Sequence, residues 1–212
     1  ICGRSIKRKM EERKMFFDTY SEMLNDTIDG LKREDIQKLF DLIEETRNNG
    51  KHLFVLGNGG SAAAASHWVC DFGKGINRGD SKRLKIFSPA DNGAIFSALG
   101  NDCGYETTFV EQMKNFLEPG DLVLTFSVSG SSSNLVEAHR YAKEIGAKTA
   151  CVVADKGGKI IGMSDFAMII PSENYGVVED IHVILGHAIS QQIYADNVGK
   201  AYWRMRICIL RH

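Results

Sequence analysis

The stretch Leu56-Gly57-Asn58-Gly59-Gly60-Ser61 decides the fold, because it joins a predicted buried strand to a predicted helix. Residues 51–56 (KHLFVL) are typical of a short strand, and residues 62–69 (AAAASHWV) are typical of a helix start. Glycines at such a junction permit a sharp turn and leave backbone N–H groups free at the helix N-terminus, where the helix dipole favours an anion such as phosphate. A tight turn that binds nothing fits the same residues, since a short glycine motif is weak evidence alone.

Strand and helix signals alternate along the rest of the chain. Further strands are predicted at 84–87, 122–126, 149–153 and 167–170. Between and after them, helices are predicted at 92–99, 105–116 and 134–145, as a short segment from 157, and at 177–198, while 71–79 is predicted as a glycine-rich loop. This alternation predicts an α/β fold, a doubly wound parallel sheet with helices on both faces. Ligands of such sheets bind at the carboxyl ends of the strands, where the strand order reverses.

The composition excludes several classes of protein. Lys and Arg total 26 and Asp and Glu total 27, so a net charge of −1 argues against a dedicated nucleic-acid or membrane-surface binder. No apolar run is long enough to span a bilayer. The five cysteines are scattered without a C-x-x-C pair, which is typical of reduced thiols in a cytoplasmic protein rather than of disulfides or a zinc knuckle.

A second loop, Ser127-Val128-Ser129-Gly130-Ser131-Ser132-Ser133-Asn134, also follows a predicted strand and opens a helix. Serine is a common N-cap, so one such loop could be an ordinary helix start. Two loops at equivalent places in one sheet favour a phosphorylated ligand. The first loop also matches the dinucleotide fingerprint, but no acidic residue follows at the expected spacing of about 20 residues, which makes a nucleotide-dependent oxidoreductase the weakest interpretation.

Two predicted helices carry histidines and carboxylates. His67 and Asp71 are spaced i,i+4 and share one helix face if the helix extends that far, while the last helix carries Glu179, Asp180, His182 and His187. Two imidazoles with one or two carboxylates suit a divalent metal such as zinc, and they also suit proton transfer at neutral pH. For His67 and Asp71 considered alone, a helix-surface pair or a core histidine is the favoured interpretation. Spacing by itself does not bring the two helices together.

Several separated motifs resemble the SIS (sugar isomerase) domain of phosphoheptose isomerases. They are 57–61, Asp91-Asn92 with 100–105, and 127–132, and the resemblance covers about residues 15–195. It implies a flavodoxin-like three-layer α/β/α domain at 51–198. Apolar residues at helical spacing in 10–29 and 34–48 predict an N-terminal helical segment at 10–50 that serves oligomerisation, and the tail at 199–212 is unassigned. The resemblance also implies a homotetramer with active sites between subunits. The implied reaction converts sedoheptulose 7-phosphate to a heptose 7-phosphate for lipopolysaccharide heptose biosynthesis.

The resemblance also assigns roles to individual residues. It implies catalysis by Asp71 and His187, and zinc binding by His67, Asp71, Glu179 and His187. The implied substrate-binding residues are Asn58, Gly59, Ser61, Ser127, Ser129, Ser132 and Glu179.

This chain departs from the family pattern where Asp71 replaces a glutamate and Glu179 replaces a glutamine, which indicates a divergent branch and another sugar phosphate as a further candidate substrate. A non-catalytic SIS protein of the replication-initiator-associating type, binding a sugar phosphate or a protein partner, is the alternative.

Overall fold

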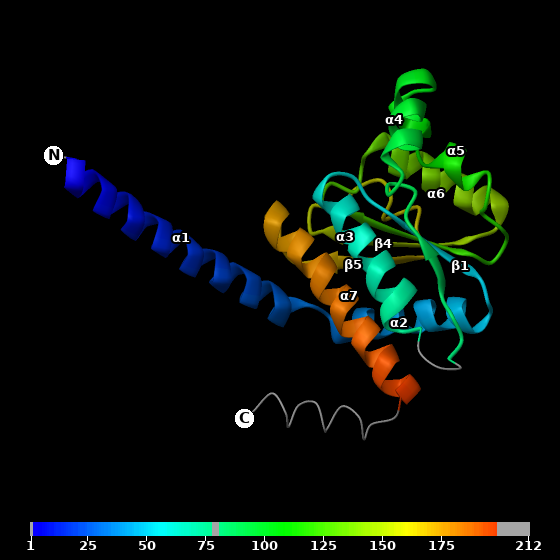
Figure 1. The fold of residues 1–212 in the computed structure, drawn as a ribbon, viewed down its shortest axis with the longest axis horizontal. Helices are drawn as coiled ribbons and strands as arrows, with labels where there is room; N and C mark the ends of the chain where they lie inside the picture. The colour runs from blue at the N-terminus through cyan, green and yellow to red at the C-terminus, as the bar shows by residue number, and fades with distance from the viewer. Residues whose placement is uncertain (1, 78–80, 199–212) are drawn as a thin grey trace.

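Five parallel strands form the sheet of the computed structural model, which describes residues 2–77 and 81–198 (Figure 1). The strands are β1 (His52–Leu56), β2 (Lys85–Phe87), β3 (Leu122–Ser127), β4 (Lys148–Ala154) and β5 (Phe166–Ile170). Their order in the sheet is β2-β1-β3-β4-β5, so the direction of winding reverses between β1 and β3. This is the flavodoxin-like order, whose ligands bind beside that reversal. The predicted doubly wound parallel sheet is therefore confirmed.

The helices connect these strands and precede them. They are α1 (Cys2–Gly30), α2 (Arg33–Asn48), α3 (Gly60–Cys70), α4 (Gly93–Asp102), α5 (Val110–Met113), α6 (Ser133–Ile145) and α7 (Tyr175–Val198), with a π-helical turn η1 (Asp71–Gly75) and a 3₁₀ turn η2 (Tyr105–Thr107). Among them, none combines the length and apolar composition needed to cross a membrane.

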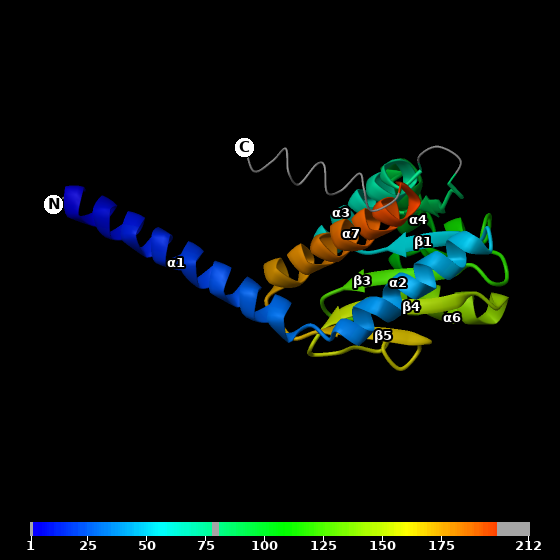
Figure 2. The ribbon, with the colours of Figure 1, turned by 90° about the horizontal axis from the view of Figure 1, so that it is seen from below.

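Two apolar layers lie on opposite faces of the sheet. Figure 2 shows the strands of the sheet with α2, α3, α6 and α7 around them. On β1, Leu53 and Val55 belong to the layer formed with α2, α3 and α7, whereas Phe54 and Leu56 belong to the layer formed with α5 and α6. This alternation follows from the two-residue period of a strand, and a sheet buried on both faces explains why the strands are continuously apolar.

Helix α1 extends away from the sheet and its covering helices in both views (Figures 1 and 2). It exposes Phe16 and Phe17 at 66% and 69% of their surface, and it contacts α7 through the Tyr20 hydroxyl, which donates to Asp180 Oδ2 at 2.6 Å. Helix α2 instead packs onto the sheet through the fully buried Leu39 and Ile43. A role of these helices in oligomerisation stays a prediction.

Three local expectations were wrong. The predicted loop at 71–79 begins as the π-helical turn η1, because the backbone hydrogen bonding of α3 continues past Cys70, and residues 78–80 lie outside the described part of the chain. The predicted helix at 105–116 divides into η2 and α5. The helix expected from 157 is a turn, since Gly158 has φ +156° and lies so close to Gly130 that a Cβ there would be 2.3 Å from its backbone.

Candidate functional site

Helices α3 and α7, with η1, bring together His67, Asp71 and His187, which we call the His–Asp–His cluster. The Nε2 atoms of His67 and His187 are 2.8 Å apart, so one imidazole donates to the other. Oδ2 of Asp71 lies 3.4 Å from the first of these nitrogens and 3.5 Å from the second. The histidine side chains are nearly half exposed, at 45% and 47%, so the cluster is open to a ligand.

Close packing of α3 against α7 creates this cluster. A Cβ at Gly186 would lie 2.3 Å from Nε1 of Trp68, so only glycine allows the two helices to approach this closely. Trp68 Nε1 also donates to the carbonyl of His182 at 2.8 Å, which fixes the relative position of the helices. Sequence reasoning missed Gly186, and the available signal was a glycine inside a long predicted helix, where it usually has a packing reason.

The turn η1 sets the position of Asp71. It continues α3 with the wider hydrogen bonding of a π-helix, a feature that often occurs at functional sites. Phe72 anchors the turn, since its ring is fully buried and stacks on Trp68 with centroids 4.9 Å apart. The shorter carboxylate at position 71 therefore still reaches both imidazoles of the cluster.

The residues of the cluster fit a zinc ion. Oδ2 of Asp71 is buried without a hydrogen bond, which leaves a carboxylate oxygen ready for a ligand. Zinc ligands at about 2.0–2.1 Å in tetrahedral geometry are roughly 3.3 Å apart, close to the separations of 2.8, 3.4 and 3.5 Å found here. Three protein ligands with an open fourth position are typical of a catalytic zinc site.

Glu179 lies elsewhere, at the N-terminus of α3. The cluster of three does not include it, and its carboxylate covers Gly60 so closely that a Cβ there would be 2.1 Å from Oε2. A carboxylate at this end of a helix is stabilised by the helix dipole. Its neighbour Asp180 points to Tyr20 of α1, and burial together with the Asp180 hydrogen bond raises the pKa of Tyr20 to about 12. Roles of Glu179 in binding metal or substrate stay predictions.

The first glycine loop has the predicted geometry of a strand-to-helix turn. Gly59 precedes α3 with φ +56°, and a Cβ at Gly57 would lie 2.5 Å from the backbone of Ser61. Ser61 itself is buried at 3% exposure in the first turn of α3. The loop thus keeps the backbone N–H groups of the helix N-terminus close to the end of β1.

Asn58 in that loop belongs to a hydrogen-bond network, which we call the loop network. Its side-chain amide exchanges two hydrogen bonds of 2.9 Å with the amide of Asn134, and Tyr105 donates to its Oδ1 at 2.8 Å. Asn134 is fully buried and also donates to Thr108 at 3.2 Å. Sequence reasoning placed Asn134 only at the end of the serine loop, and spacing gives no signal for its pairing with Asn58.

The serine loop lies beside β1, because β3 is the neighbour of β1 in the sheet. The hydroxyl of Ser127 accepts from the N–H of Gly130 at 3.0 Å, and that of Ser129 accepts from the N–H of Ser131 at 3.4 Å. Ser132 occupies the N-cap position of α6 without a capping hydrogen bond from its side chain. The hydroxyls of this loop and the N-terminus of α6 therefore lie together at the carboxyl end of β3.

Two further histidines are structural. Burial lowers the pKa of His139 to about 4, and its ring contacts the hydroxyls of Thr125 and Ser164. Burial also lowers the pKa of His182 to about 4, and its Nε2 donates to the carbonyl of Val152 at 3.2 Å. These two rings are neutral core groups, so only one of the two histidines on α7 joins the cluster.

Sequence comparisons relate this chain to known proteins. The SIS domain family model matches residues 15–154. A phosphoheptose isomerase of Thermodesulfovibrio yellowstonii is 34% identical over 160 residues, covering 74% of this chain and 78% of that protein. A phosphoheptose isomerase of Clostridium acetobutylicum is 32% identical over 172 residues, covering 81% and 87%.

Solved structures show the same fold. That of a phosphoheptose isomerase from Neisseria gonorrhoeae superposes with a TM-score of 0.78 at 25% identity, covering 87% of this chain and 98% of that one. A phosphoheptose isomerase from Francisella tularensis, at 21% identity and a TM-score of 0.77, supports the fold alone. With the sheet order, the two loops and the matched residues in agreement, the chain belongs to the SIS domain family and is related within it to the phosphoheptose isomerases.

Proposed function

We propose that the protein is an aldose–ketose isomerase acting on a sugar phosphate, with sedoheptulose 7-phosphate as the first substrate to test. The observation that carries this proposal is the convergence of Asp71 and His187, whose Oδ2 and Nε2 atoms are 3.5 Å apart although they come from different helices. A protein that only binds a sugar phosphate does not require an acid–base pair there. The names of the curated relatives support the same reaction class.

The phosphate group would bind at the serine loop. Ser127, Ser129 and Ser132 offer hydroxyls beside the N-terminus of α6, and Ser61 adds one from α3. The carboxylate of Glu179 already lies over Gly60, and its negative charge opposes a phosphate at the N-terminus of α3. We therefore expect Glu179, Asn58 and Gly59 to face the hydroxyl-bearing part of the sugar.

Isomerisation then needs two proton transfers. A base removes the proton from the carbon next to the carbonyl, an enediol forms, and the proton returns to the neighbouring carbon. Asp71 would act as this base, and His187 would move the proton between the two oxygens. In the protein without metal, the hydrogen bond of 2.8 Å between the Nε2 atoms of His67 and His187 holds the ring of His187 in a fixed orientation, and a zinc ion bound to both nitrogens would replace this bond.

His67, Asp71 and His187 would also hold the zinc ion and leave its fourth position open for the substrate. The predicted role of Glu179 as a further ligand would require its carboxylate to move from its place over Gly60. When bound, zinc would supply Lewis-acid polarisation of the sugar carbonyl. Asp71 has a second carboxylate oxygen, so coordination through Oδ2 leaves Oδ1 able to accept a proton.

We further propose a homotetramer with sites between subunits. Support comes from α1, which extends away from the sheet (Figure 1). Its Phe16 and Phe17 are exposed. Light scattering of the full chain measures the assembly directly, and a monomer at micromolar concentration would contradict this part of the proposal.

Incubation with sedoheptulose 7-phosphate, with and without added zinc, tests the reaction by detection of the heptose 7-phosphate product. We expect turnover by the wild type and its loss in His187→Ala. Other aldose and ketose phosphates belong in the same assay, because Glu179 and Asp71 depart from the family pattern. Binding of sugar phosphates without turnover of any of them would overturn the enzymatic proposal and favour a non-catalytic SIS protein.

A further inference from the structure

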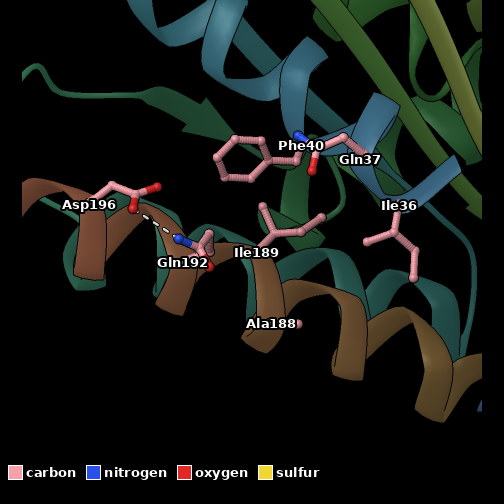
Figure 3. A pocket seen from close by; sticks show the side chains of 7 residues that line it. All are labelled: Ile36, Gln37, Phe40, Ala188, Ile189, Gln192 and Asp196. Carbon is pink, nitrogen blue, oxygen red and sulfur yellow. Dashed lines mark hydrogen bonds between the residues drawn. The ribbon is translucent and has the colours of Figure 1, made fainter. Parts of the chain in front are cut away.

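Two cavities in the described part of the chain differ in the state of their polar side chains. One is a groove of about 410 Å³ between α2 and the C-terminal half of α7, with an apolar surface formed by Ile36, Phe40 and Ile189 (Figure 3). Gln192 in this groove already donates to Asp196 of the same helix at 2.9 Å. No described residue or contact shows what covers the groove, so it identifies no ligand.

The second cavity adjoins the serine loop at the carboxyl ends of β3 and β4. Its volume is about 290 Å³, and Ser129, Ser131, Lys156 and Glu173 supply its polar side chains together with Tyr175. Pockets for small molecules commonly measure about 300–1,000 Å³. A cavity at the lower end of this range suits a phosphate group with one end of a sugar rather than a whole nucleotide.

The turn after β4 fixes one wall of this cavity against the serine loop. A Cβ at Gly158 would lie 2.3 Å from the backbone of Gly130, so the two segments are in direct backbone contact. The N–H of Ile160 also donates to the carbonyl of Gly130 at 3.1 Å. The cavity is therefore formed before a ligand binds, which lowers the cost of binding.

Two serine hydroxyls in the cavity keep a proton for a ligand. The hydroxyl of Ser129 accepts from the N–H of Ser131 at 3.4 Å, and the hydroxyl of Ser131 accepts from the N–H of Lys159 at 3.3 Å. Neither bond uses the hydroxyl proton, because a hydroxyl can donate while it accepts. Both hydroxyls can therefore donate to the oxygens of an anion, which the N-terminus of α6 also favours.

Lys156 is the cationic side chain that lines this cavity. Its Nζ lies 2.6 Å from Oε2 of Glu173, and the two side chains are 69% and 58% exposed. This hydrogen bond raises the pKa of Lys156, so the side chain is cationic at neutral pH. An ion pair this exposed stabilises the fold little, so it can open at small cost.

We propose that Lys156 leaves Glu173 and pairs with the phosphate of the substrate when that phosphate binds beside Ser129 and Ser131. This inference rests on the proposed sugar-phosphate substrate and adds a recognition residue for it. A phosphate monoester carries a charge of about −1.5 to −2 at neutral pH, so it attracts Lys156 more strongly than the single charge of Glu173 does. A helix N-terminus supplies only about half a positive charge, which leaves the phosphate in need of a cation.

Two substitutions that break the same ion pair test the proposal, with inorganic phosphate as a probe that cannot isomerise. Lys156→Gln should weaken phosphate binding about tenfold, because it removes a charge-assisted hydrogen bond. Glu173→Gln should strengthen binding about threefold, because Lys156 then has no competing carboxylate. Lys159→Gln is the matched control, since this exposed lysine carries the same charge but does not line the cavity. Calorimetric titration of the full chain at low salt measures each Kd.

The direction of the two effects decides the outcome, because loss of a purely structural ion pair would change binding in the same direction in both variants. Changes in the same direction, or an effect of Lys156→Gln no larger than that of Lys159→Gln, would overturn the proposal. With a sugar phosphate that is turned over, Lys156→Gln should lower kcat/KM mainly through a higher KM. Phosphate titration tests Lys156 even if no sugar phosphate is turned over. Turnover by the wild type with unchanged phosphate binding in Lys156→Gln would overturn only this inference and not the isomerase proposal.

Discussion

The helix pair α3/α7 and the two loops at the carboxyl ends of β1 and β3 differ in how far their polar side chains are hydrogen-bonded. In the loop network, Asn58 and Asn134 satisfy each other, and Tyr105 and Thr108 complete the bonds. Beside it, the hydroxyls of Ser127 and Ser129 accept from N–H groups of their own loop. In the His–Asp–His cluster, a buried carboxylate oxygen has no hydrogen bond and two half-exposed imidazoles face each other.

We call the loop network the frame and the His–Asp–His cluster the reactive centre. A satisfied network holds a fixed shape, because each of its bonds would cost free energy to break. An unsatisfied carboxylate oxygen beside two imidazoles keeps its capacity to accept a metal, a proton or a substrate hydroxyl. We therefore expect changes in the cluster to remove chemistry with little loss of stability, and changes in the loop network to do the reverse.

The largest effect is expected for Asp71→Asn, which keeps the shape of the side chain and removes its charge. Loss of the base should lower kcat for the sugar phosphate by about 10²–10⁴-fold. The thermal midpoint should stay within a few degrees, because the side chain has no hydrogen bond at Oδ2 to lose. Steady-state kinetics measures the effect, with exposed Asp155→Asn as control, and a change below threefold would contradict the role of Asp71.

The second-largest effect is expected on metal binding, when one imidazole of the cluster is removed. His67→Ala should lower zinc affinity at least about a hundredfold, the upper range seen even for partners outside the coordination shell. Calorimetric titration of zinc into the apoprotein gives this value, and His52→Gln, which lies outside the cluster, is the control. Retention of one tightly bound zinc per chain in His67→Ala would show that the metal binds elsewhere.

A substitution in the loop network should lower the stability of the protein rather than its activity. Asn134→Ala removes a fully buried side chain and leaves Asn58 without its partner, so the free energy of unfolding should fall by about 1–3 kcal/mol. Urea unfolding measures this, with exposed Asn115→Ala as control. If Asn134→Ala abolished turnover at unchanged stability, the contrast between frame and reactive centre would be wrong.

The buried histidines give the smallest effect per pH unit, and it takes the form of a pH dependence. The folded state holds the pKa of both His139 and His182 near 4, below the value of 6.5 expected when unfolded. The unfolded state therefore binds more protons as pH falls from 6.5 towards 4, and stability is lost over that window by up to about 1.4 kcal/mol per pH unit for each histidine. Urea titrations from pH 7 to 4.5 should show a smaller slope for His139→Gln than for wild type. An unchanged slope would argue that His139 is protonated in the folded protein.

Much of the fold follows from local patterns in the chain. The alternation of apolar strands with helices, and glycines after 56, predict the parallel sheet and the loop at its carboxyl edge, because both depend on neighbouring residues. Spacing also predicts the contact of His67 with Asp71, since positions i and i+4 meet on one face of a helix.

Only the tertiary structure decided which of the remaining residues meet. His67 and His187 are 120 positions apart, and their contact depends on Gly186 admitting Trp68 between the helices. The same packing buries His182 and leaves His187 exposed, although both lie on α7. The sequence determined the sheet, the loops and the residue types of the site, whereas helix packing decided which site residues are in contact. The reason is that distances between segments far apart in the chain are set by side-chain volumes at the helix interface and not by spacing along the chain.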